Sequence, residues 1–311
     1  MANFRRIVLP SLTIFRLVRF PNLLIIALTQ ILLGYILYES IDVGELSQFQ
    51  FGLLILTTVF IAASGYVIND IYDFEIDLIN KPQKVIVGKL IFKNQAWMVY
   101  WWIVVVGGLI AIYLAYVIQD FKQLFIYPSA ILLLWAYAKS FKKSFVVGNL
   151  VVAAYCALVP GILWYAEREP YSILLESNKA TAFYVRNVFL AYALMAFLTT
   201  VWREIIKDME DLEGDIAFGS ESIPAKYGMS LAQKMASIIG LIVIGLMLKY
   251  VSYLFKNEEW LALGYLLIPI VIAIYSTMLS FKSLNVSVLH QVSQQVKWLM
   301  VLGLGYLFFL L

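Results

Sequence analysis

The sequence has almost none of the residues that build disulfide frameworks or soft-metal centres. It contains one cysteine, Cys156, inside an apolar run, and one histidine, His290. A single cysteine excludes an internal disulfide and a cysteine metal cluster. A single histidine argues against haem ligation and against a histidine-based zinc site.

Charged residues are also scarce. Asp, Glu, Lys and Arg make up 14% of the chain and 62% of the residues are hydrophobic, whereas soluble domains contain roughly a quarter charged residues. This is the composition of an integral membrane protein. No linker composition interrupts the chain, so we predict a single membrane domain over residues 1–311, with 1–19 as an uncleaved interfacial segment. The net charge is only +3, and we expect no nucleic-acid partner.

Windows without charge predict nine transmembrane helices, because about 20 apolar residues cross the hydrocarbon core. Five windows are long enough by themselves: 20–38, 46–69, 94–119, 144–166 and 260–281. Four more need a flanking Lys or Arg to extend to the interface: 123–138, 187–202, 235–248 and 298–311. With a cytoplasmic N-terminus, 17 of the 23 Lys and Arg residues fall on the cytoplasmic side, as the positive-inside rule requires.

Two acidic stretches interrupt this apolar sequence, NDIYDFEID (69–77) and KDMEDLEGD (207–215). Their aspartates share a spacing of three and then four residues: Asp70, Asp73 and Asp77 in the first, and Asp208, Asp211 and Asp215 in the second. Residues at this spacing lie on one face of a helix, so each trio predicts an acidic stripe. Both stretches follow even-numbered predicted helices and therefore emerge on the cytoplasmic side.

Three carboxylates on one stripe repel one another and call for a cation. Mg²⁺ prefers oxygen ligands and is usually held by one or two carboxylates together with substrate phosphates. We therefore predict that the two stripes face each other and bind a diphosphate through Mg²⁺. Asn69, one turn before Asp73, adds a neutral oxygen. Basic side chains on the same side would neutralise the remaining charge, namely Lys84, Lys142, Lys143, Arg203 and Lys207.

The duplication of the motif is also an architectural signal. An acidic stretch after one membrane helix is ordinarily a solvated loop or a helix cap, but two with equal spacing on one side favour a binding site. Asp73 and Asp211 are 138 residues apart, as are Asp70 and Asp208. This offset predicts an all-α fold of two four-helix halves around a central cavity, plus a ninth helix.

The two motifs resemble those of the UbiA superfamily of intramembrane prenyltransferases. That family carries N-D-x-x-D-x-x-x-D after its second helix and D-x-x-x-D after its sixth, and both are complete here. Further matching stretches are RLVRFPNLLI, which contains Arg19 and Asn22, then INKP and YAKSFKKSFVVGN. One segment departs from the family. Where many members read approximately RPDRPIPSG, this chain has KPQKVIVGK, with Lys81 and Lys84 in place of arginines.

The resemblance implies Mg²⁺-dependent transfer of a polyprenyl group from its diphosphate to a lipophilic acceptor. REIIKDMEDLEGD followed by SIPAKYG is similar to the digeranylgeranylglyceryl phosphate synthases, which implies a geranylgeranyl donor and an alcohol acceptor. Homogentisate prenyltransferases and chlorophyll synthases share much of the pattern, so an aromatic acceptor remains the alternative. A cation transporter is a more remote one, because the acids cluster at one face and not near the bilayer midplane.

These considerations give a set of candidate site residues. The expected metal ligands are Asn69, Asp70, Asp73, Asp77, Asp208, Asp211 and Asp215. The expected diphosphate ligands are Arg19, Asn22, Lys84, Lys142, Lys143, Arg203 and Lys207. The expected catalytic residues are Asp73, Asp211, Lys142, Arg203 and Tyr137. Aromatic faces stabilise a cation, and the candidates for that role are Tyr66, Tyr72, Trp135, Tyr137 and Tyr155. We expect a multi-pass protein of the cell membrane with its site on the cytoplasmic side.

Overall fold

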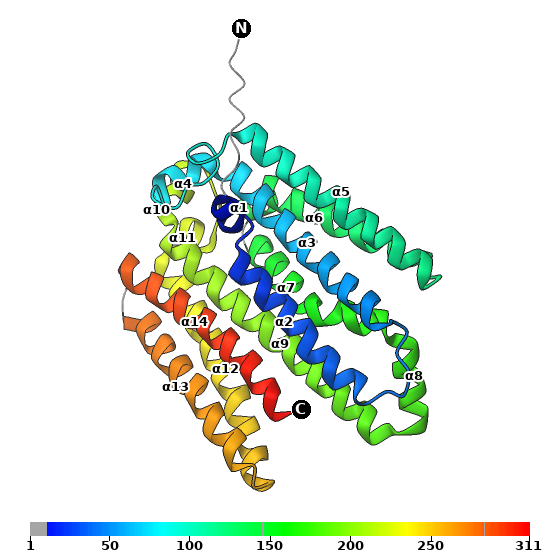
Figure 1. Ribbon diagram of the computed structural model, residues 1–311. Helices are drawn as coiled ribbons and strands as arrows, with labels where there is room; N and C mark the ends of the chain where they lie inside the picture. The colour runs from blue at the N-terminus through cyan, green and yellow to red at the C-terminus, as the bar shows by residue number, and fades with distance from the viewer. Residues whose placement is uncertain (1–10, 145, 283) are drawn as a thin grey trace. The chain divides into compact units, whose positions relative to one another are not determined.

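The computed structural model of the chain describes residues 11–144, 146–282 and 284–311, without the side chains of Ser11 and Lys143 (Figure 1). Apart from an isolated bridge between Val87 and Ile91, these residues form helices and their connections. The α-helices are α1 (Ser11–Leu17), α2 (Phe20–Tyr38), α3 (Gln48–Tyr72), α4 (Phe74–Asn80), α5 (Lys93–Val117), α6 (Ile126–Lys139), α7 (Val147–Ala166), α8 (Arg168–Ser177), α9 (Lys179–Glu210), α10 (Leu212–Ala217), α11 (Ile223–Tyr227), α12 (Met229–Lys256), α13 (Trp260–Lys282) and α14 (Val286–Tyr306). Three short 3₁₀ helices complete the described part: η1 (Phe121–Phe125), η2 (Phe141–Lys143) and η3 (Leu307–Phe309). Residues 1–10 of the predicted interfacial segment lie outside it.

Eight helical segments of the described residues are long and apolar enough to cross a membrane. They are α2, α3, α5, the continuous segment of η1 and α6 (Phe121–Lys139), α7, α9, α12 and α13. Each coincides with one of the predicted windows. The protein is therefore an all-α, multi-pass integral membrane protein. α14, at the ninth window, is not among the eight. Its first twelve residues contain His290, three glutamines (Gln291, Gln294 and Gln295) and Lys297, which lower its hydropathy.

Three helices extend well beyond their predicted windows. α9 was expected over 187–202 and has 32 residues, and α12 was expected over 235–248 and has 28. α14 begins at Val286, whereas the window begins at 298. A hydropathy window ends at the first charge. A helix continues past that charge when the charged side chain has a partner or reaches water.

The chain divides into two compact units. Unit 1 comprises Met1–Ala27 and Gly52–Lys139, and unit 2 comprises Leu28–Phe51 and Ser140–Leu311. The division passes through α2 and α3, so that the first acidic stretch belongs to unit 1 and the second to unit 2.

The core of unit 1 lies beside the end of α3 that carries the first acidic stretch. Val67, Ile68 and Ile71 of α3 are buried there with Leu17 of α1. The connection between α4 and α5 packs into the same core through three apolar residues, Ile86, Val87 and Ile91. This connection contains the KPQKVIVGK segment that departs from the resembled family. Val85 and Val87 stand where many members have prolines, and both are buried and contribute apolar packing.

The core of unit 2 is arranged around α9, which contacts α7, α8, α12 and α14 (Figure 1). Trp202, Ile205 and Ile206 of α9 are fully buried in it. Gly240 of α12 lies so close to Trp202 that a Cβ atom would overlap the indole ring. Close packing on several sides fixes the position of α9, and hence of the second acidic stretch at its end.

Unit 2 also contains a fully buried carboxylate, Glu167, between α7 and α8. It accepts hydrogen bonds from the Tyr38 hydroxyl of α2 at 2.5 Å, from the Glu45 backbone N–H at 2.7 Å and from the Leu46 backbone N–H at 3.2 Å. Gly44 leaves room for this contact, since a Cβ atom there would meet Tyr38 and Glu167. Glu167 therefore holds the connection after α2 against the end of α7.

Replacing Glu167 with alanine should destabilise the protein by about 3 kcal/mol, because three donors lose a charged acceptor at a buried site. The neighbouring Glu169, whose side chain is 69% exposed, is the matched control, and its alanine variant should be nearly as stable as the wild type. Thermal unfolding of both variants in detergent measures the difference. Equal stability of the two would show that the Glu167 contacts contribute little.

Candidate functional site

The first acidic stretch occupies the junction between α3 and α4. α3 ends at Tyr72, α4 begins at Phe74, and Asp73 lies between them with φ −85° and ψ −2°. The Asp73 N–H donates to the Asn69 carbonyl at 2.8 Å, and the Asp77 N–H donates to the Asp73 carbonyl at 2.8 Å. Hydrogen bonds of helical spacing therefore cross the junction and keep these residues one turn apart.

The second acidic stretch occupies an equivalent junction, between α9 and α10. Asp211 lies between the two helices with φ −97° and ψ 9°. Its N–H donates to the Lys207 carbonyl at 2.8 Å, and the Asp215 N–H donates to the Asp211 carbonyl at 3.1 Å. Asp73 and Asp211 thus share a local backbone structure as well as a motif position. Each expected stripe is therefore interrupted at its middle aspartate, which lies between a long helix and a short one.

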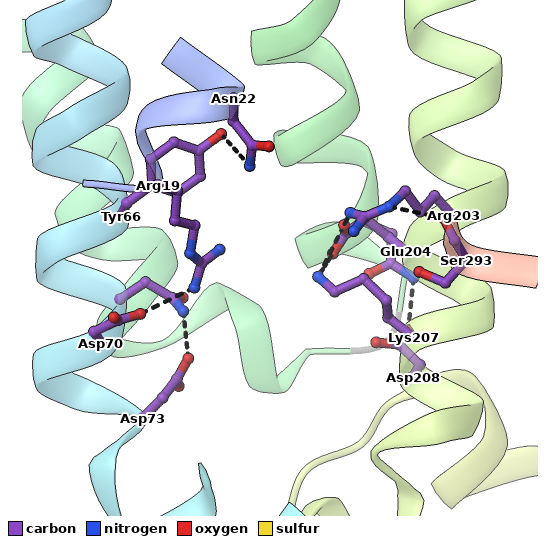
Figure 2. Close-up of polar contacts among 12 residues, drawn as sticks. Arg19, Asn22, Tyr66, Asp70, Asp73, Arg203, Glu204, Lys207, Asp208 and Ser293 are labelled. Atoms are coloured by element: carbon purple, nitrogen blue, oxygen red, sulfur yellow. Dashed lines mark hydrogen bonds and ion pairs between the residues drawn. The ribbon is translucent and has the colours of Figure 1, made fainter. Parts of the chain in front are cut away.

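The first cluster consists of Arg19, Asp70 and Asp73, with Tyr66 one turn earlier on α3 (Figure 2). Asn69 joins it through a hydrogen bond to Asp73. Arg19 Nη2 donates to Asp70 Oδ1 at 2.9 Å, and Asn69 Nδ2 donates to Asp73 Oδ2 at 2.5 Å. Asp73 is buried, being only 4% exposed. The cluster therefore combines carboxylate and amide groups with the Arg19 guanidinium, which pairs with Asp70.

Arg19 reaches this cluster from the bend between α1 and α2. Its backbone has φ +52°, in the left-handed region that is uncommon for residues other than glycine. Its guanidinium lies 4.9 Å from the centroid of the Tyr66 ring, and Asn22 Nδ2 donates to the Tyr66 hydroxyl at 3.4 Å. Burial disfavours the charged guanidinium, but the nearby Asp70 carboxylate outweighs this effect and raises the pKa of Arg19. Arg19 therefore stays positively charged.

The second cluster centres on Glu204, one turn before Asp208 on α9 (Figure 2). Lys207 Nζ donates to Glu204 Oε1 at 3.0 Å and to Oε2 at 2.8 Å. Arg203 Nη1 lies 3.5 Å from Glu204 Oε1, and Arg203 Nε donates to the Ser293 carbonyl of α14 at 3.3 Å. Two of the expected diphosphate ligands thus share one carboxylate.

Two further polar contacts lie beside this cluster. Asn149 Nδ2, from the first turn of α7, donates to Asp208 Oδ2 at 2.8 Å. His290 Nδ1 of α14 lies 2.9 Å from Glu210 Oε1, next to Asp211. α7 and α14 are therefore both attached to the end of α9 that carries the second motif.

The sequence interpretation missed Glu204, Asn149 and the Glu210–His290 pair. Glu204 had a detectable signal, since it lies four residues before Asp208 and so continues the same acidic stripe by one turn. Asn149 had none, because its contact with Asp208 joins residues 59 positions apart.

The structure also describes most of the other predicted basic and aromatic residues. Lys84 is exposed on the connection after α4. Lys142, in η2, interacts electrostatically with Glu204, and the side chain of Lys143 lies outside the described part. Among the aromatic candidates, Tyr66 belongs to the first cluster. The remainder lie on α3, α6 and α7: Tyr72 packs edge-on to Trp97, Trp135 lies under Lys139, and Tyr137 and Tyr155 are partly buried.

The carboxylate and amide oxygens of the two acidic stretches suit a hard cation. In the described ranges, no three or more His, Cys, Asp or Glu side chains are arranged to hold a metal ion together. Mg²⁺ fits such a donor set, since it is usually bound by one or two carboxylates and completes its octahedron with water and substrate phosphate oxygens. The expected pairing of the two stripes stays a prediction.

The chain is similar to several curated proteins named digeranylgeranylglyceryl phosphate synthase. It is 34% identical over 238 residues to that of Thermococcus sibiricus, an alignment that covers 76% of this chain and 75% of the relative. It is 31% identical over 263 residues to that of Hyperthermus butylicus, covering 83% and 81%. The identity to that of Methanobrevibacter smithii is 30% over 239 residues, covering 76% of each chain.

Solved structures of similar fold cover nearly the whole chain. One, from work on digeranylgeranylglyceryl phosphate synthase in membranes, has a TM-score of 0.58 and 25% identity and covers 96% of each chain. A UbiA homolog from Archaeoglobus fulgidus, bound to DMAPP and Mg²⁺, has a TM-score of 0.53 and 16% identity, covering 95% of this chain and 99% of its own. The model of the UbiA prenyltransferase family matches residues 24–306. With both motifs complete at equivalent helix junctions, this protein belongs to the UbiA prenyltransferase family.

Proposed function

We propose that this prenyltransferase uses Mg²⁺ to transfer a polyprenyl group, of geranylgeranyl type, from its diphosphate to a lipophilic alcohol. The proposed acceptor is similar to geranylgeranylglyceryl phosphate, and the product would be an ether lipid. The observation that carries this proposal is the equivalent placement of Asp73 and Asp211, each at a helix junction. Arg19 pairs with Asp70 of the first acidic stretch, and Lys207 of the second pairs with Glu204. The curated relatives support the choice of donor and acceptor, because they share the synthase name over three quarters or more of their length.

The clusters can perform the chemistry by binding and stabilising negative charge. When bound, Mg²⁺ would neutralise the diphosphate and the pyrophosphate that leaves. The residues proposed to hold it are Asn69, Asp70, Asp73, Asp77, Asp208, Asp211 and Asp215. Arg19, Asn22, Lys84, Lys142, Lys143, Arg203 and Lys207 are proposed to bind phosphate oxygens. Positive groups that are already oriented stabilise charge as it develops, without reorganising during the reaction.

The bond changes follow from an allylic diphosphate and an alcohol. The C–O bond to the diphosphate breaks, both electrons leave with pyrophosphate, and the allylic cation remains. The acceptor hydroxyl oxygen then forms the new C–O bond and releases its proton. Aromatic faces stabilise cations in a dry site. For this role we propose Tyr137, together with Tyr66, Tyr72, Trp135 and Tyr155.

The membrane arrangement that we propose has nine spans. α14 has 21 residues, enough to cross the hydrocarbon core at about 1.5 Å per residue. We propose further that the chain is one domain of two four-helix halves plus this helix, that it resides in the cell membrane, and that the site opens on the cytoplasmic side. The distribution of Lys and Arg supports that orientation.

The test is a product assay with the purified protein, Mg²⁺ and geranylgeranyl diphosphate. Geranylgeranylglyceryl phosphate, homogentisate and a buffer blank are supplied as acceptors in parallel, and products are identified by mass spectrometry. The expected result is a digeranylgeranyl product with the alcohol alone. A prenylated aromatic product would show that the acceptor is aromatic and not an alcohol. Absence of any prenylated product, with cation flux in liposomes, would contradict the proposed function.

A further inference from the structure

Glu204 is a buried carboxylate on which the basic residues of the second cluster converge. It is 8% exposed, and it contacts Lys207 through both of its oxygens and Arg203 through one. Lys142 adds a further favourable electrostatic interaction. Lys142, Arg203 and Lys207 are all proposed to bind phosphate oxygens, and all three belong to unit 2.

The contacts orient the two cations that lie on α9. Lys207 is one turn from Glu204, and its ammonium spans the two carboxylate oxygens (Figure 2). Arg203 is held at two points, by Glu204 and by the Ser293 carbonyl. A guanidinium has five N–H donors in a fixed plane, so these two contacts determine the direction of the others. Glu204 therefore fixes both cations before any anion is bound.

The same carboxylate also competes with an anion for these cations. The Glu204 carboxylate lies 2.8 Å from the Lys207 ammonium and 3.5 Å from the Arg203 guanidinium. Its negative charge weakens the attraction that both cations exert on phosphate oxygens. The pyrophosphate released by transfer carries at least as much negative charge as the diphosphate of the donor. A cluster without Glu204 would thus retain the product more tightly, which slows turnover.

We propose that Glu204 is a positioning residue that orients Arg203 and Lys207 in the free enzyme and limits their affinity for pyrophosphate, so that this product is released. The inference rests on the proposed function, since it takes pyrophosphate to be the product. It extends that function to a residue that neither binds metal nor touches the reacting carbon. The proposal predicts that removing the negative charge of Glu204 strengthens the binding of pyrophosphate.

The variant Glu204→Gln tests this predicted increase in affinity. Glutamine has the same shape as glutamate and still accepts a hydrogen bond from Lys207, but it carries no charge. Calorimetric titration of the detergent-solubilised protein with inorganic pyrophosphate and Mg²⁺ is expected to give about tenfold tighter binding than the wild type. In steady-state assays, kcat and the KM for the donor should both fall. Unchanged or weaker pyrophosphate binding by the folded variant would overturn the proposal.

Two further variants separate this role from a general charge effect and from a folding defect. Glu221→Gln makes the same charge change at an exposed ion pair with Lys226 and is expected to bind pyrophosphate as the wild type does. Glu204→Asp keeps the charge but withdraws it by one methylene, so its affinity should lie between those of the wild type and Glu204→Gln. Should Glu204→Gln not fold, wild-type affinity in Glu204→Asp overturns the proposal. If the wild type itself shows no prenyl transfer, that result would instead contradict the proposed function.

Discussion

Replacing Asp73 or Asp211 with asparagine is expected to lower prenyl transfer by at least about 1,000-fold. Asparagine keeps the size of the side chain and the helix junction but removes the negative charge that a hard cation requires. Both aspartates occupy the break between a membrane helix and a short helix, so the two variants should behave alike. Steady-state rates with a radiolabelled donor measure the loss, and thermal unfolding in detergent shows whether the variants remain folded.

The motifs themselves provide matched controls. Glu75 and Glu213 lie two residues after Asp73 and Asp211, and both are exposed. Their glutamine variants remove one charge from the same short helices and should retain nearly wild-type rates. Substantial transfer by folded Asp73→Asn and Asp211→Asn would remove both aspartates from the metal set. Equal losses in the glutamine variants would point to a general effect of charge on these segments.

Chelation of divalent cations should abolish transfer, and added Mg²⁺ should restore it. The carboxylates at each junction are close to one another along the chain, and on their own they do not enclose a metal ion within the described residues. Such a site binds Mg²⁺ weakly and depends on phosphate oxygens to complete it. Dialysis against excess chelator followed by titration with MgCl₂ in the transfer assay gives the dependence. Full turnover in excess chelator would contradict a role for Mg²⁺.

The membrane helices could be located from the sequence because the cost of burying charge in lipid is large and local. Their ends could not. α9 continues from 202 to Glu210, because Arg203, Glu204 and Lys207 neutralise one another along one helical face. α14 likewise begins with polar residues that a hydropathy window rejects, and its His290 and Ser293 have partners on α9. The ends of these helices depend on the ion pairs and hydrogen bonds of their polar side chains, and hydropathy contains no information about such contacts.

The aspartates of the site could be found because a spacing of three and four residues is a property of the chain alone. The contacts that orient them depend on tertiary structure. Asn149 reaches Asp208 from α7, and Arg19 reaches Asp70 from a bend with a left-handed backbone. Glu204 could have been included by extending the spacing one turn toward the N-terminus. The ion pairs of Glu204 with Arg203 and Lys207 were not predicted. Six other acidic residues lie within 204–221, and the sequence does not show which acid pairs with these cations.

The most direct measurement is equilibrium binding of geranylgeranyl thiolodiphosphate, a donor analogue that resists cleavage, to the wild type and to Asp73→Asn and Asp211→Asn. Each protein is titrated with and without Mg²⁺. Binding to the wild type is expected to require Mg²⁺, and each aspartate variant is expected to lose at least about tenfold in affinity. Wild-type affinity in either folded variant, or equal binding in the absence of divalent cations, would contradict diphosphate binding through metal held by the two acidic stretches.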